Sequence, residues 1–506
     1  MSHFAESISI SDNLYSVKAT RDLDQSAIAE MDDTGILLMK RAGSAALDEL
    51  FQAFGRPSLI TVFCGSGNNA GDGYIIAALA SQKKIPVTVY ELGDTEKFSN
   101  ETAQARKFSE HANVTFAAFD KNIQLTGGVI VDSLLGIGFS GALRDVYAEA
   151  VSIINNAELP VLSVDIPTGL DADTGAVTSE AVRADLTVTF IGAKKGLFTG
   201  RGPALCGDVI YHSLDVAEYL FDSVKADAQL LDAHSLLDLL PEWDADVHKG
   251  QRGHSMIIGG DTGYGGAAAI AAEASLKTGC GLTSVATQPQ HVSAVIARCP
   301  EIMTYGVTSG QHLEPLLERP SALVIGPGLG RSPWSEQLLQ KALDSGLPLV
   351  IDADALNILA EGRLVKDRGY HQWVLTPHPG EAARLLGSTV EEIQADRFAA
   401  VREIQRRYKA QVLLKGPGTL VAGENEIVKV CPYGNSAMAS AGMGDLLSGI
   451  IGSLIAQGLS LQKSAELGCC IHSCAADMAV SERGHRALIT TDIFFYLHKL
   501  LNRDYL

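Results

Sequence analysis

Residues 58–84 read SLITVFC, GSGNNAGDG and YIIAALASQKK: an apolar run, a glycine-rich segment and a second apolar stretch. An unbroken apolar run, without in–out alternation, is typical of a strand buried on both faces of a parallel sheet. We expect YIIAALASQKK to be a helix that follows a glycine turn. Further runs of the first kind follow at 86–92, 127–135, 160–167 and 186–192. The pattern predicts a parallel sheet with crossover helices.

A second α/β series begins beyond a polar stretch around Ser223 to Asp246. Its apolar runs lie at 255–260, 282–287, 322–328, 348–354, 372–378 and 411–418. A chain of 506 residues is too long for one ordinary hydrophobic core, which favours more than one domain. We therefore predict two three-layer α/β domains, residues 1–225 and residues 226–506, the first of them Rossmann-like.

Composition and charge restrict the classes of function. A net charge of −19 argues against a general affinity for nucleic acid, which needs a basic face. The eight cysteines form no CxxC pair, so we expect reduced thiols in a cytoplasmic protein, with Cys469, Cys470 and Cys474 packed in a core. The longest uncharged apolar stretch, 446–462, is shorter than a membrane span, and the first residues do not resemble a signal peptide. We expect small-molecule substrates, no membrane or nucleic-acid partner, and a homo-oligomer.

The glycine-rich segment after 58–64 predicts a ligand site. A strand, a glycine turn and a helix present backbone N–H groups and a helix dipole to an anion. The spacing of Gly65, Gly67 and Ala70, with Glu91 after the next strand, even fits the fingerprint of a dinucleotide-binding dehydrogenase. Asp72 argues against this interpretation, because a carboxylate in the turn would repel a diphosphate. A tight turn with hydrogen bonds from the asparagine side chains is the plainer alternative.

Two later runs end in polar residues, at the edge where α/β sheets bind ligands. Asn69, Asp132 and Thr168 offer hard oxygen ligands, which suit an alkali or alkaline-earth cation better than zinc. Asp165 is then a carboxylate left for acid–base work. The alternative is that Asp132 and Asp165 only cap turns.

Three motifs in this half closely resemble the NAD(P)H-hydrate epimerase family: GSGNNAGDGY, VDSLLGIGFSG and SVDIPTGLDADTG. The resemblance implies a potassium ion held by Asn69, Asp132 and Thr168, with Asp165 as the catalytic carboxylate. It also implies a hydrated nicotinamide nucleotide as substrate. The implied substrate contacts are Asn68, Asn69, Ala70, Gly71, Asp72, Gly136, Ile137, Gly138, Phe139, Ser140, Gly141, Ala142 and Asp165. The family loop usually reads GNNGGDG, and Ala70 departs from it, which would cost energy if that position needs φ > 0.

In the second half the chemistry lies in loops within residues 248–282, 324–332, 374–386 and 412–421 and, above all, in the run SAMASAGMGDLLSGI at 436–450. No GxxxxGK[ST] loop of the Walker type is present in the sequence. Instead, the backbone N–H groups around Met443 and Gly444, with the dipole of the following helix, point to a site for a transferring phosphate. Asp445 can accept the proton of a substrate hydroxyl. An Asp that merely caps the helix is the alternative.

These loops resemble, in order, those of the ribokinase-like NAD(P)H-hydrate dehydratase family. The resemblance implies ADP and Mg²⁺ as cofactors and a reaction that phosphorylates the hydroxyl of the S hydrate, eliminates phosphate and leaves AMP. The implied nucleotide contacts are Lys415, Gly416, Pro417, Gly418, Thr419 and Gly444. The implied contacts with the hydrated nicotinamide are Ala267, Gly328, His378 and Asp445. Ser436, Ala437 and Ala441 depart from the usual family loop but leave Gly444 and Asp445 in place.

Together the two resemblances predict a bifunctional enzyme that repairs hydrated NADH and NADPH. The first domain would interconvert the R and S epimers, and the second would dehydrate the S form. A ribokinase-type small-alcohol kinase fused to a non-catalytic nucleotide-binding domain is the main alternative, and a binding or scaffold protein is another. Intact Asp132, Asp165 and Thr168 weigh against a first domain that has lost catalysis.

Overall fold

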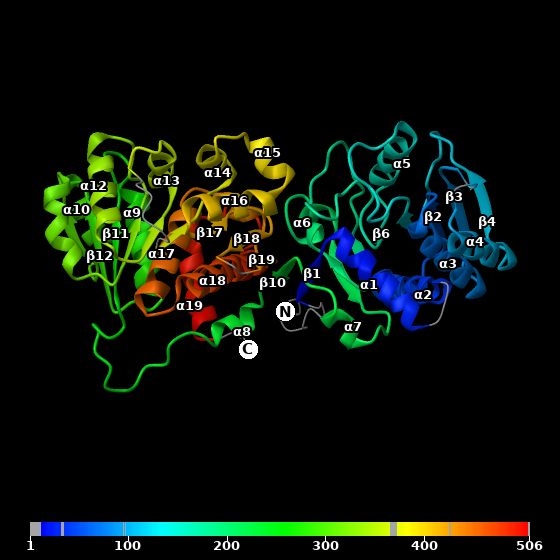
Figure 1. Ribbon diagram of the computed structural model, residues 1–506, viewed down its shortest axis with the longest axis horizontal. Helices are drawn as coiled ribbons and strands as arrows, with labels where there is room; N and C mark the ends of the chain where they lie inside the picture. The colour runs from blue at the N-terminus through cyan, green and yellow to red at the C-terminus, as the bar shows by residue number, and fades with distance from the viewer. Residues whose placement is uncertain are drawn as a thin grey trace. The chain divides into compact units, whose positions relative to one another are not determined.

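The computed structural model describes residues 12–31, 35–94, 96, 98–364, 372–424 and 427–503. The chain divides into two compact units, Met1–Gln229 and Leu230–Leu506 (Figure 1). Within the described residues, no helix is both long enough and apolar enough to span a membrane.

The first unit is built on a parallel sheet of seven described strands in the order β4-β3-β2-β5-β6-β7-β9. The strands are β2 (Ile60–Cys64), β3 (Val87–Glu91), β4 (Thr115–Ala118), β5 (Val129–Ser133), β6 (Val161–Val164), β7 (Leu186–Phe190) and β9 (Asp208–His212). The chain adds β3 and β4 on one side of β2 and then returns to add β5 on the other side. The strand order therefore reverses between β2 and β5, and such a switch point opens a crevice at the carboxyl ends of the strands.

Helices cover this sheet. They are α1 (Val17–Glu30), α2 (Ile36–Phe54), α3 (Asn68–Gln82), α4 (Asn100–His111), α5 (Asp145–Asn156), α6 (Gly202–Leu205) and α7 (Glu218–Asp222). Two short strands, β1 (Asn13–Tyr15) and β8 (Ala193–Lys194), pair in parallel, with Leu14 opposite Ala193 and Tyr15 opposite Lys194. This pairing fixes the position of α1, because α1 begins two residues after β1.

Helix α3 begins earlier than the sequence indicated. We expected a turn through Gly73, but Asn68–Gln82 is helical and Gly67 is its N-cap. The glycines serve close packing: a Cβ at Gly71 would lie 2.4 Å from Met39 Cε, and one at Gly73 would lie 2.6 Å from Ser133 Oγ. Ala70 is helical and fully buried and does not have a positive φ, so its departure from the family loop carries no backbone strain.

The second unit has a mixed sheet in the order β13-β12-β11-β14-β15-β16-β17-β18-β19. It is parallel from β13 to β17, and β18 and β19 are antiparallel. These strands are β11 (His254–Ile258), β12 (Leu282–Thr287), β13 (Met303–Gly306), β14 (Ala322–Ile325), β15 (Leu349–Ile351), β16 (Trp373–Leu375), β17 (Gln411–Leu414), β18 (Thr419–Ala422) and β19 (Val428–Cys431); β10 (Ala228–Leu230) precedes them. The strand order reverses here between β11 and β14, so this sheet also has a switch point.

The helices of this unit are α8 (Ala233–Leu237), α9 (Gly265–Lys277), α10 (Val292–Arg298), α11 (Gly310–Leu313), α12 (Pro333–Asp344), α13 (Ala353–Ala360), α14 (Pro379–Leu386), α15 (Val390–Ala395), α16 (Arg397–Tyr408), α17 (Met443–Ala456), α18 (Leu461–Arg483) and α19 (Ile493–Leu501). Cys469, Cys470 and Cys474 on α18 lie in the main hydrophobic core, as predicted. All eight cysteines of the chain are free and buried.

Candidate active sites

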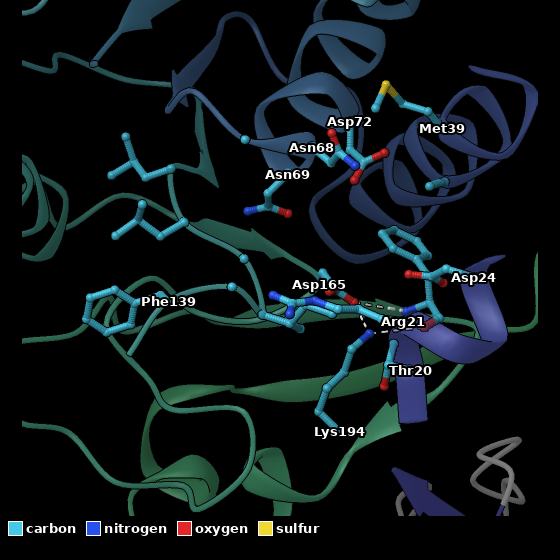
Figure 2. Close-up of a pocket in the computed structure, with 18 of the residues that line it drawn as sticks. Thr20, Arg21, Asp24, Met39, Asn68, Asn69, Asp72, Phe139, Asp165 and Lys194 are labelled. Carbon is cyan, nitrogen blue, oxygen red and sulfur yellow. Dashed lines mark hydrogen bonds and ion pairs between the residues drawn. The ribbon is translucent and has the colours of Figure 1, made fainter. Parts of the chain in front are cut away.

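A cavity of about 840 Å³ lies at the switch point of the first unit. Its lining comes from α1 and α2, from the start of α3, and from the loops that follow β5, β6 and β7. Figure 2 shows Asn68, Asn69 and Asp72 of α3 on one side of it, and Asp165 and Lys194 on the other. Polar side chains therefore converge on the crevice that the strand order creates.

Asp165 is held in this cavity by one of its two carboxylate oxygens. It directly follows β6 and has φ of +66°, a conformation that costs energy for a residue other than glycine and is typical of functional sites. Its Oδ1 accepts hydrogen bonds from Thr189 Oγ1 at 3.1 Å, from the Phe190 N–H at 3.3 Å and from Lys194 Nζ. No described residue donates to Oδ2. One oxygen is thus anchored, and the other is left for a ligand.

Lys194 is the cation that anchors Asp165, and it was not identified from the sequence. Its side chain is only 1% exposed, and it lies on the short strand β8. Its ammonium also donates to Thr189 Oγ1 at 3.1 Å and to the Phe190 carbonyl at 3.0 Å. An ammonium has three N–H groups, so all of them are used within the protein. Lys194 therefore acts on a substrate through Asp165.

Two further carboxyl groups share the cavity, Asp24 from α1 and Asp72 from α3. Burial raises the pKa of Asp24 to about 6, with the Lys194 charge opposing this shift. Burial, followed by the charges of Asp165 and Asp24, raises the pKa of Asp72 well above its ordinary value. These effects favour the protonated form of Asp72, which can donate a hydrogen bond. Asp24 was not identified from the sequence, because it lies in a helix that carries no recognisable motif.

The three oxygen ligands predicted for a cation lie at the carboxyl ends of the strands. Asp132 is fully buried, and it accepts hydrogen bonds from Thr168 Oγ1 at 2.7 Å, from the Thr168 N–H at 2.8 Å and from Ser163 Oγ at 2.9 Å. Burial raises the pKa of Asp132 against these bonds. The side-chain amide of Asn69 is buried, and neither its oxygen nor its nitrogen has a partner among the described residues. Buried polar atoms without a partner usually contact an ion or a water, so the Asn69 oxygen is available as a ligand to a cation, while Asp132 and Thr168 hydrogen-bond to each other.

Most of the other predicted substrate contacts of the first unit line the cavity, and a few do not. Of the residues implied by the family resemblance, Asn68, Asn69, Asp72, Gly136, Ile137, Gly138, Phe139, Ser140, Ala142 and Asp165 line the cavity. Ala70, Gly71 and Gly141 do not appear in its lining. Ala70 and Gly71 face the packing between helices, because α3 begins at Asn68.

In the second unit, α17 begins directly after Gly442, which is the N-cap with φ of +89°. No side chain caps this end, and Asp445 lies inside the first turn. The alternative in which Asp445 caps the helix is therefore wrong. The first backbone N–H groups of α17 are left without a side-chain partner, as an anion site requires.

A buried ion pair lies beside this helix start. Lys415 Nζ is 2.9 Å from Asp352 Oδ1, and Thr376 Oγ1 and Ser448 Oγ donate to the same carboxylate at 2.8 and 2.7 Å. Burial alone would raise the pKa of Asp352, but the Lys415 ammonium and these hydrogen bonds outweigh it and lower the pKa. A Cβ placed on Gly444 would lie 3.3 Å from Lys415 Nζ. The ammonium therefore sits against the start of α17.

Asp445 lies among other carboxylates in this site. Burial and then the charge of Asp352, with those of Asp354 and Glu381, raise the pKa of Asp445 to about 7. Burial also raises the pKa of Glu381 to about 7. A carboxylate that titrates near neutral pH suits a general base. Asp352 and Glu381 were not identified from the sequence, although Asp352 lies within the apolar run 348–354.

The remaining predicted contacts of this unit lie on neighbouring loops. His378 is the N-cap of α14, its side chain is 51% exposed, and its Nδ1 accepts from the Gly380 N–H at 2.9 Å. Burial and the Lys415 charge lower the pKa of His378, so the imidazole is neutral at pH 7. Gly328 has φ of +57°, and a Cβ there would lie 3.1 Å from Ala267 Cβ. The loops after β11 and β14 therefore meet at the second switch point.

The Lys415–Thr419 segment joins β17 to β18. Arg397, fully buried on α16, donates to the carbonyls of Leu414 and Lys415 at 3.2 and 3.4 Å. Thr419 Oγ1 donates to the Gly416 carbonyl at 3.0 Å. The segment is thus a fixed loop, and Lys415, at its start, points to the ion pair with Asp352.

Comparison with known proteins gives each unit a counterpart. Residues 35–196 match the family described as YjeF-related protein N-terminus, and residues 255–499 match the family described as NAD(P)H-hydrate dehydratase. The bifunctional NAD(P)H-hydrate repair enzyme Nnr of Coxiella burnetii is 45% identical over 489 residues, which cover 97% of this chain and 99% of the relative. The chain belongs to the family of bifunctional NAD(P)H-hydrate repair enzymes.

Other relatives agree. The enzyme of the same name from Vibrio cholerae is 39% identical over 97% of this chain and 98% of its own length. A crystal structure of a ribokinase-like superfamily protein from Enterococcus faecalis superposes with a TM-score of 0.50 at 27% identity, over 54% of this chain and 95% of that one. The predicted α/β fold class and the predicted bifunctional repair activity, epimerase and dehydratase, are confirmed. A small-alcohol kinase with a non-catalytic partner domain is not favoured, because both halves align with single repair enzymes.

Replacing Lys194 with Met tests the anchoring of Asp165. Met fills the buried space but removes the ammonium, so we expect kcat for epimerisation to fall roughly 10²-fold or more. KM should change little, because Lys194 Nζ has no N–H left for substrate. Steady-state epimerisation kinetics give both constants, the dehydration rate of the S epimer is the control for the second unit, and the thermal unfolding of the variant shows whether the first unit is folded.

Lys225→Met, at an exposed position in the same unit, is the matched control and should behave as wild type. Lys194→Arg keeps the charge and should recover part of kcat. A wild-type kcat in Lys194→Met would show that Asp165 does not need this ammonium.

Proposed function

We propose that the cavity of the first unit is the epimerase site and that Asp165 is its catalytic base. In the hydrated ring, C6 carries a hydroxyl and is bonded to the ring nitrogen N1, which is a hemiaminal arrangement. Oδ2 of Asp165 accepts the hydroxyl proton, the C6–N1 bond breaks to give a C6 carbonyl, and N1 takes up a proton. Closing the ring on the other face of that carbonyl gives the other epimer. The observation that supports this assignment is the anchored Oδ1 and unpartnered Oδ2 of Asp165.

Asp72 is the group that we assign to the proton on N1. Burial and then the charge of Asp165 favour the protonated form of its carboxyl, and Asp72 lines the same cavity. A protonated carboxyl and an ionised one in a single site divide acid and base roles between them. Ring opening and closing then return both protons to their starting positions, so the cavity is ready for another turnover.

We also propose that Asn69, Asp132 and Thr168 hold a potassium ion in this unit. The support is the donor set, which consists of oxygen atoms, and the buried Asn69 amide without a protein partner. One carboxylate gives too little charge for a tight all-protein calcium site. The bound cation would supply a local positive charge for the oxygens of the nucleotide, while the protein groups named above move the protons.

For the second unit we propose an ADP-dependent dehydratase mechanism with Asp445 as general base. Asp445 accepts the proton of the substrate hydroxyl, that oxygen attacks the terminal phosphorus of ADP, and AMP leaves. The C6–O bond then breaks with phosphate as the leaving group, and loss of a proton from C5 forms the C5=C6 double bond and restores the dihydronicotinamide ring. The first N–H groups of α17 and the Lys415 ammonium flank the position of the transferring phosphoryl group, and charge stabilisation of this kind is a large part of catalysis.

The other residues implied by the family resemblance take binding roles in this proposal. Ala267, Gly328 and His378 would contact the hydrated ring, while the Gly416–Thr419 loop and Gly444 would contact the nucleotide. Magnesium in nucleotide sites is usually held by one or two carboxylates together with the phosphates. Asp354 and Glu381, which act electrostatically on Asp445, are the carboxylates available near those phosphates.

Two variants test the division of labour. Asp165→Asn should abolish epimerisation and leave dehydration of the S epimer unchanged, whereas Asp445→Asn should do the reverse. Loss of a general base typically lowers a rate by ~10²–10⁴. Separate assays with purified R and S hydrates, corrected for spontaneous exchange, measure both activities. A variant that loses both activities, or neither, would remove that residue from its role.

The raised pKa of Asp445 predicts how the rate of dehydration depends on pH. A base works only when ionised, so with a pKa of about 7 against an ordinary 3.8, kcat/KM for dehydration should fall as pH drops below 7. The slope should approach about tenfold per pH unit between pH 6 and 5. Glu381 titrates in the same range, and its charge is one of those that raise the pKa of Asp445, so Glu381→Gln should keep the acid limb but move it to lower pH. A flat profile from pH 5 to 8 would contradict the assignment.

The cation proposal predicts that epimerisation is faster in potassium than in sodium or in a bulky organic cation at matched ionic strength. The reason is that the site would match the size and the hard oxygen chemistry of one ion. Asp132→Ala should abolish both the activity and the salt preference, since it removes the only carboxylate of the set. Initial rates in the three salts measure this. Equal rates, with no bound ion in a crystal grown in potassium, would overturn it.

A further inference from the structure

The cavity of the first unit is lined by more carboxylates than cations. Its acidic lining residues are Asp24, Asp72, Glu101 and Asp165, and its basic ones are Arg21, Arg144 and Lys194. A hydrated nicotinamide dinucleotide carries a diphosphate, which such a cavity would repel unless cations face it. Lys194 donates all its N–H groups to protein atoms. Arg21 and Arg144 are thus the described lining cations that remain for the substrate.

Arg21 reaches the cavity from α1. The pairing of β1 with β8 fixes α1 beside the site, and Figure 2 shows the Arg21 side chain pointing from α1 into the cavity. A Cβ placed on Gly138 would lie 3.4 Å from Arg21 Nη2, which is ordinary contact distance. Arg21 is exposed, and its charge acts on the neighbouring Asp24, but it forms no hydrogen bond or ion pair with any described residue. Its guanidinium therefore lies free, against the glycine loop.

Arg144 stands at the other end of that loop. It follows Leu143, directly after the Gly136–Ala142 segment, and is the N-cap of α5. It too is exposed and lines the cavity, and its side chain has no partner among the described residues. Two free guanidinium groups thus flank one glycine-rich loop, one from α1 and one from α5.

We propose that Arg21 and Arg144 bind the diphosphate of the hydrated nicotinamide dinucleotide from the two sides of the Gly136–Ala142 loop. The planar fork of a guanidinium matches phosphate oxygens in a bidentate way. The proposal rests on the assignment of epimerisation to this cavity. Arg21 precedes residue 35, where the match to the YjeF-related family begins, so α1 would complete the site from outside the matched segment.

The test is the kinetics of epimerisation by the full chain with Arg21→Ala and Arg144→Ala. Hydrogen bonds to charged groups contribute about 1.5–3 kcal/mol, so each variant should raise KM roughly tenfold or more. The kcat should change less than about twofold, because neither residue takes part in proton transfer. Inorganic pyrophosphate should compete with substrate in the wild type, and its inhibition constant should rise in both variants. Arg21→Lys, which keeps the charge but loses the fork, should have an intermediate KM.

Two variants serve as controls. Lys18→Ala removes an exposed cation of α1, the helix that carries Arg21, and Arg183→Ala removes an exposed cation elsewhere in the first unit; neither residue lines the cavity. Both should keep the wild-type KM, and dehydration of the S epimer by the second unit should be normal in every variant. Wild-type epimerisation with unchanged KM and unchanged inhibition by pyrophosphate in Arg21→Ala and Arg144→Ala would overturn this inference alone. A wild-type chain without epimerase activity would overturn the proposed function and this inference with it.

Discussion

A parallel strand that is buried on both faces can present its polar groups only at its ends, and both units of this chain obey that constraint. Every residue of β2, β5, β6 and β7 is buried, so side chains in the middle of these strands cannot contact a ligand. The reversal of strand order between β2 and β5, and again between β11 and β14, separates the following loops and leaves a crevice there. The positions of Asp132, Asp165 and Asp352 follow from this arrangement, because each lies at the end of a strand or directly after one.

Burial near such a crevice disfavours the ionised form of a carboxylate. In both units a lysine pairs with one such carboxylate and stabilises its charge. An unpaired carboxylate in a poorly solvated site shifts its pKa upward and loses its charge. Lys194 pairs with Asp165, and Lys415 pairs with Asp352. In the first unit the paired carboxylate is the proposed base, and its neighbours Asp24 and Asp72 have raised pKa values. In the second unit the paired carboxylate only holds the lysine, and the proposed base, Asp445, is the neighbour with the raised pKa.

The sequence predicted the parts of the sites that are encoded locally. Asp165 follows the end of a strand, and Asp445 follows a glycine run. Each of these short patterns predicts a functional carboxylate without information from the rest of the chain. Lys194 and Asp352 were not identified because their roles depend on partners that are distant in the sequence. Lys194 pairs with Asp165, 29 residues away, and Asp352 pairs with Lys415, 63 residues away. The start of α3 was placed too late for a related reason. Glycines such as Gly73 indicate a turn when read locally, whereas here they allow a helix to pack against Ser133.

We expect one chain to return both epimers of a damaged nucleotide to use, because epimerisation in the first unit supplies the S form for dehydration in the second. The most direct measurement mixes R and S hydrates of NADH with the full chain, ADP, Mg²⁺ and potassium, and follows the NADH absorbance to completion. NADH should be fully recovered from both epimers, with AMP and phosphate formed in equal amounts. Recovery that stops at the S fraction plus spontaneous exchange, or a phosphorylated hydrate that accumulates, would contradict it.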